Sequence, residues 1–80
     1  MLPNSVIAYL EDAARKARTT VPDRNASLFE AGLLDSFGLV DFVSLIEQEC
    51  GIRVEDSALR PDNFDTIAKV ESFVARTSRN

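Results

Sequence analysis

The chain has 80 residues, a formal net charge of −4 and an apolar content of 45%. This length suits one domain and leaves little volume for a deep, enclosed active site. The sequence has no histidine and one cysteine, Cys50. These counts exclude a Ser-His or Cys-His catalytic pair, a zinc site built from His and Cys ligands, and an internal disulfide. We therefore expect no autonomous catalysis and no metal site.

Three further features concern location. No apolar run approaches the roughly 20 residues that cross a bilayer, and the N-terminal residues lack the basic and apolar regions of a secretory signal. A single cysteine fits a reducing compartment. The sequence thus predicts a cytoplasmic protein without membrane insertion.

Acidic side chains are concentrated in the middle of the chain. Residues 25–52 contain five Asp or Glu and no Lys or Arg, a net charge of −5, whereas residues 53–80 contain five of each sign. Such a negative field repels nucleic acid and anionic lipid and favours basic protein partners. A solvated acidic face that only aids solubility is the simpler interpretation.

The first predicted helix covers residues 4–18, with Asn4 or Ser5 as its cap and apolar residues at helical spacing. A long connection follows, over about residues 19–35. Its apolar residues can pack on the core, and Gly32 indicates a turn. These apolar residues are Leu28, Phe29, Leu33 and Leu34.

The second predicted helix, over residues 36–50, is the clearest one. Asp35 or Ser36 caps it, Gly51 ends it, and apolar residues recur at i, i+3, i+4 and i+7. This stripe consists of Leu39, Phe42, Val43 and Ile46.

A short helix over residues 56–60 should end before Pro61. A last helix over residues 66–76 begins after Asp65 as its cap and carries Ile67, Val70 and Phe73 on one face. No stretch alternates for long enough to indicate a sheet. We predict an all-α fold, a small bundle of three main helices plus one short helix, in a single domain over residues 1–80.

Ser36 has a simple structural interpretation as a helix cap beside Asp35. Two details argue against that interpretation alone. A reciprocal capping box needs Glu or Gln three residues later, but Gly38 follows Asp35 and Leu39 follows Ser36. Glycine in the first turn also costs about 1 kcal/mol relative to alanine. Since Phe37 lies outside the apolar stripe, this helix start indicates a contact site.

The residues around Ser36 resemble the phosphopantetheine attachment signature of acyl carrier proteins. The matching run is Leu28-Phe29-Glu30-Ala31-Gly32-Leu33-Leu34-Asp35-Ser36-Phe37-Gly38-Leu39-Val40. The likeness extends from about Val6 to Val74, including the turn at residues 51–54 and the start of the last helix. It is specific because the helical pattern and the acidic second helix accompany it.

The resemblance implies a function and a set of site residues. Ser36 would carry 4′-phosphopantetheine derived from coenzyme A, and Asp35 would be recognised by the phosphopantetheinyl transferase. The thiol of this arm would hold an acyl or aminoacyl group as a thioester, so the carrier needs no catalytic base of its own. Residues of the second helix would meet partner enzymes, namely an adenylating ligase or synthase and downstream acyl-accepting enzymes. The expected partner-binding residues are Phe37, Val40, Asp41, Ser44 and Glu47.

The runs at residues 32–38 and 60–66 look closer to stand-alone carriers loaded by adenylating ligases than to fatty-acid carriers. D-alanyl, other aminoacyl and specialised-metabolite carriers belong to that group. The second helix also carries fewer acids than is usual for fatty-acid carriers, with Gly38 and Ser44 at places that are often acidic or bulky. We expect a monomer. The alternative that stays open is an unmodified, acidic helical protein–protein interaction module.

Overall fold

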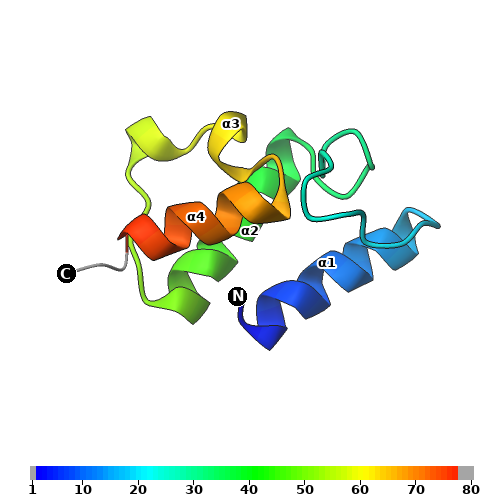
Figure 1. Cartoon of the computed structure of the whole chain (residues 1–80), viewed down its shortest axis with the longest axis horizontal. Coiled ribbons are helices and arrows are strands. Elements are labelled where there is room, and N and C mark those ends of the chain that lie inside the picture. The colour runs from blue at the N-terminus through cyan, green and yellow to red at the C-terminus, as the bar shows by residue number, and fades with distance from the viewer. Residues whose placement is uncertain (1, 78–80) are drawn as a thin grey trace.

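The computed structural model describes residues 2–77, so Met1 and residues 78–80 of the predicted domain lie outside the described residues. Figure 1 shows helices joined by loops, and residues 2–77 contain no strand. The helices are α1 (Asn4–Lys16), α2 (Ser36–Cys50), α3 (Pro61–Phe64) and α4 (Ile67–Thr77), with a 3-10 turn, η1, at Asp56–Ala58. The prediction of an all-α fold with three main helices is confirmed.

The core forms where the apolar stripes of the helices meet the loop before α2. Each long helix contributes residues spaced three or four apart, and this spacing places them on one face. The loop contributes Leu28, Leu33 and Leu34, as expected from its apolar content. The buried helix residues are Val6, Leu10 and Ala14 of α1; Leu39, Phe42, Val43 and Ile46 of α2; Phe64 of α3; and Ile67, Val70 and Phe73 of α4.

Both ends of α1 differ from the prediction. Pro3 stands at the N-cap position without a side-chain hydrogen bond, and Asn4 is already helical, so the expected cap at Asn4 or Ser5 is wrong. The helix ends at Lys16 because Arg18 has a φ of 59°, in the left-handed region. Thr19 N–H donates to the carbonyl of Ala14 at 2.9 Å. This bond over the helix end belongs to a Schellman motif.

The loop between α1 and α2 is attached to α4 and to Asp65, the residue that closes α3. Leu28 N–H donates to the carbonyl of Asp65 at 2.7 Å, and Ala68 N–H donates to the carbonyl of Arg24 at 3.0 Å. Arg24 also pairs with Glu71 of α4. The segment that precedes α2 is therefore held by the C-terminal part of the chain.

The region between α2 and α4 contains two short elements where one was predicted. The turn η1 is shorter than the expected helix over residues 56–60, and Pro61 begins α3. Proline fits the first position of a helix, because its missing N–H would have no intrahelical partner there. Asn63 Nδ2 donates to the carbonyl of Ala58 at 2.8 Å and ties α3 to η1.

The predicted cap of the last helix is also wrong. Thr66, not Asp65, caps α4: its Oγ1 accepts a hydrogen bond from Lys69 N–H at 3.1 Å. Asp65 closes α3 instead, and its carboxylate accepts a hydrogen bond from Ser27 Oγ. Local sequence could not separate these two neighbouring polar residues, because both are good caps.

Candidate functional site

The turn that leads into α2 is built on buried leucines. Leu33 and Leu34 donate their N–H groups to the carbonyl of Leu28 at 3.0 and 3.3 Å. Gly32 has a φ of 85°, a conformation that side chains other than glycine rarely adopt. Because Leu33 and Leu34 point into the core, the residues that follow are brought to the surface at the start of α2.

Asp35 is the cap of α2. Its Oδ1 accepts a hydrogen bond from Gly38 N–H at 2.6 Å, and its carbonyl accepts one from Leu39 N–H at 2.8 Å. A Cβ atom at position 38 would lie 3.2 Å from Asp35 Oδ1, so glycine leaves room for this carboxylate. The capping role that the sequence left open between Asp35 and Ser36 therefore belongs to Asp35.

Ser36 is the first residue of α2 and is exposed. Among residues 2–77, its hydroxyl has no hydrogen-bond partner. In an α-helix the first N–H groups have no intrahelical partner, and here those of Ser36 and Phe37 face outward at the positive end of the helix dipole. These donors fit the phosphodiester of a phosphopantetheine arm, because helix N-termini bind phosphate groups in this way.

A strip of side chains runs along α2 from this serine. Phe37 and Val40 are the two exposed large apolar side chains of the described part of the chain, at 87% and 51% exposure. Asp41 and Ser44 are exposed on the same strip. Residues at i, i+3, i+4 and i+7 share one helix face, so these four residues form a single surface, which we call the α2 strip.

Glu47 lies one turn further along and differs from the α2 strip. It is half-buried, and its Oε2 accepts a hydrogen bond from Val54 N–H at 2.7 Å. This contact holds the chain where it turns back after α2. Glu47 therefore has a structural role that sequence reasoning did not foresee, because its partner is a backbone group outside the helix.

Tyr9 of α1 is a second residue that sequence reasoning missed. Its ring lies against Phe42, with centroids 5.6 Å apart. Burial raises the pKa of Tyr9, and the nearby charges of Asp41 and Asp35 raise it further. From the sequence alone, Tyr9 could be assigned only to the first predicted helix.

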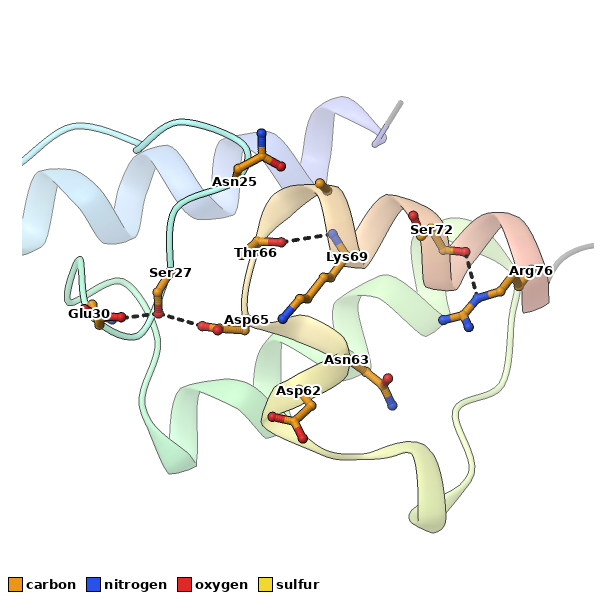
Figure 2. A pocket seen from close by; sticks show the side chains of 11 residues that line it. Asn25, Ser27, Glu30, Asp62, Asn63, Asp65, Thr66, Lys69, Ser72 and Arg76 are labelled. Carbon is orange, nitrogen blue, oxygen red and sulfur yellow. Dashed lines mark hydrogen bonds between the residues drawn. The ribbon is translucent and has the colours of Figure 1, made fainter.

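Two hollows in the surface of residues 2–77 lie away from Ser36. The larger, of about 720 Å³, is lined by side chains of the loop before α2, of α3 and of α4, such as Ser27, Asn63 and Lys69 (Figure 2). A second, of about 480 Å³, lies beside the end of α1 and is lined by residues such as Arg15 and Thr19. Neither is lined by Ser36 or by the α2 strip, and Ser36 is exposed.

This combination of a small helical bundle and an exposed serine at a helix N-terminus fits a carrier-type domain. Within residues 2–77, no helix has the length and apolar character needed to cross a membrane. The chain matches the family PP-binding, described as phosphopantetheine attachment site, over residues 5–74. The chain belongs to this family, whose members carry a covalently attached 4′-phosphopantetheine and are generally not catalytic themselves. A search of curated proteins finds no match.

Proposed function

We propose that this chain carries an acyl or aminoacyl group as a thioester on 4′-phosphopantetheine attached to the hydroxyl of Ser36. The observation that carries this proposal is the position of Ser36 as the exposed first residue of α2, next to the capping carboxylate of Asp35. The arm supplies the thiol that anchors the acyl group. The residues of the chain hold the phosphodiester at the helix N-terminus and present the site to partner enzymes.

The α2 strip is the proposed docking surface for these partners. Phe37 and Val40 supply exposed apolar area next to the modification site. Asp41 and Ser44 supply a polar edge, and the exposed carboxylates of Asp35 and Asp41 supply negative charge there. Apolar contact surrounded by polar groups, combined with electrostatic steering, suits brief encounters with several enzymes. The proposed partners are a phosphopantetheinyl transferase, an adenylating ligase or synthase, and downstream acyl-accepting enzymes.

Among carriers, we propose the stand-alone type that adenylating ligases load with an aminoacyl or specialised-metabolite group. The support is the motif around Ser36, together with Gly38 and Ser44 at places where fatty-acid carriers are often acidic or bulky. We propose that this carrier is monomeric, non-catalytic and cytoplasmic. The absence of histidine from the sequence supports its dependence on partner enzymes for catalysis.

The proposal is tested by intact mass after incubation with coenzyme A and a broad-specificity phosphopantetheinyl transferase. The wild type should gain one phosphopantetheine unit, and Ser36→Ala should gain none. Ser72→Ala is the matched control, since it removes another exposed helical hydroxyl, from α4 and outside the α2 strip, and it should be loaded like the wild type. A wild type without added mass, or loading of Ser36→Ala, would refute the assignment.

An unmodified interaction module is the second candidate. It is favoured by the exposure of Phe37 and Val40, because an apolar surface on this helix could bind a partner without any arm. This candidate predicts no mass gain in the wild type. It also predicts partner binding that is unchanged by Ser36→Ala and lost when Phe37 is truncated.

A further inference from the structure

A hydrogen-bonded junction connects the loop before α2 to the residue that closes α3. Ser27 Oγ donates to Asp65 Oδ1 at 2.6 Å and accepts a hydrogen bond from Glu30 N–H at 3.1 Å (Figure 2). The carbonyl of Asp65 accepts from Leu28 N–H at 2.7 Å. Asp65 thus holds two consecutive loop residues, one through its side chain and one through its backbone.

This junction is linked to the Ser36 site through the buried turn. The carbonyl of Leu28 accepts the N–H groups of Leu33 and Leu34, and Leu28 is fully buried. Leu34 directly precedes Asp35, the residue that caps α2. A shift of Leu28 is therefore transmitted over a few bonds to the helix start. The contacts run from Asp65 through Leu28 and Leu34 to the capping carboxylate.

We propose that Ser27 and Asp65 are positioning residues that hold the segment before Ser36 in the geometry needed for phosphopantetheine transfer. This inference rests on the proposed function. The hydroxyl–carboxylate bond has the length of a charge-assisted hydrogen bond and is half-buried, so water competes with it less than on an open surface. Neither side chain belongs to the α2 strip. Their effect passes through Leu28 and the turn.

The kinetic consequence distinguishes positioning from simple stability. Without the Ser27–Asp65 bond, the turn would occupy several conformations, and only a fraction would present Asp35 and Ser36 correctly. When only a fraction of a protein is competent to bind, its apparent affinity falls by that fraction. The KM for the carrier in the transferase reaction should therefore rise, while kcat at saturating carrier stays the same.

The test compares Ser27→Ala, which breaks the bond, with Ser27→Thr, which keeps the hydroxyl. In the second pair, Asp65→Ala removes the acceptor of the Ser27 hydroxyl, whereas Asp65→Asn retains an acceptor oxygen. Transfer from coenzyme A by the transferase is measured well below each unfolding midpoint. We expect the KM of Ser27→Ala and Asp65→Ala to rise at least about threefold with unchanged kcat, and Ser27→Thr to restore it. Amide exchange at Leu33 and Leu34 should quicken in Ser27→Ala.

Asn63→Ala is the control variant. It breaks a half-buried hydrogen bond of α3 that is not connected to the loop, and its KM should stay at the wild-type value. An unchanged KM in Ser27→Ala, or an equal rise in Asn63→Ala, would overturn the positioning role while leaving the proposed function intact. A wild-type chain that is not loaded at all would instead overturn the proposed function itself.

Discussion

Asp35 and Ser36 are adjacent in the chain and carry different tasks. The carboxylate of Asp35 accepts the N–H of Gly38 and begins α2, whereas the hydroxyl of Ser36 is exposed beside it. The negative charge of Asp35 next to a phosphodiester is unfavourable in itself. We attribute this residue to recognition by the transferase in addition to capping. The two roles can be separated by substitution.

Asp35→Asn should leave the free energy of unfolding within about 0.5 kcal/mol of the wild type, because asparagine caps helices as well as aspartate does. Asp35→Ala should lose about 1 kcal/mol, since the N–H of Gly38 is then left without its partner. Urea unfolding measures both. Transfer of phosphopantetheine should slow in both variants if the charge is recognised. Wild-type transfer to Asp35→Asn would limit the role of Asp35 to capping.

At the scale of elements, α2 has two faces with different functions. One face buries its apolar residues in the core, and the other presents the α2 strip to solvent. Phe37 contributes almost nothing to the core at 87% exposure. An apolar side chain left so exposed beside the proposed modification site fits a contact that forms only in complexes.

Phe37→Ala should therefore weaken partner binding without destabilising the chain. We expect the KM of the carrier for the transferase to rise about fivefold, equivalent to ~1 kcal/mol of lost binding, and the free energy of unfolding to change by less than about 0.5 kcal/mol. Gln48→Ala truncates another exposed residue of α2, three turns from Ser36, and should bind normally. Equal effects of the two variants would argue against a localised docking surface.

The elements also show how far sequence reasoning reached. The long helices and their buried faces followed from apolar spacing, and α2 occupies the predicted residues. The four-residue helix α3 was missed, because one turn is too short to show a period. The role of Asp65 was missed because its partner Ser27 lies 38 residues away in the sequence. The exposure of Phe37 was predictable, since it lies outside the apolar stripe.

At the scale of the whole molecule, two half-buried ionisable side chains, Tyr9 and Cys50, link stability to pH. Burial raises the pKa of Tyr9, helped by the charges of Asp41 and Asp35, and burial raises the pKa of the Cys50 thiol, helped by Glu49. In both cases the folded chain holds the proton more tightly than the unfolded chain. The resulting stability is present below the ordinary pKa values of 10.0 and 9.0 and is lost as pH rises through the folded values.

We therefore expect the melting temperature to fall as pH rises above about 9, where the thiol of the unfolded chain is about half ionised. The Tyr9→Phe and Cys50→Ala variants remove the two ionisations, and together they should make the decline shallower. Thermal unfolding monitored by circular dichroism measures the melting temperature at each pH. A series from about pH 7 to about pH 11 covers the titration of both the thiol and the phenol. An equally steep decline in the double variant would contradict the linkage.

The burial of Cys50 also affects how reporter groups can be attached to the loaded chain. Only a thiolate reacts readily with maleimides, and burial raises the pKa of the Cys50 thiol further above neutral pH. It is the only cysteine in the sequence. The solvated thiol at the end of a phosphopantetheine arm would react first. A fluorophore or spin label could then follow the arm in the native sequence, without a cysteine substitution.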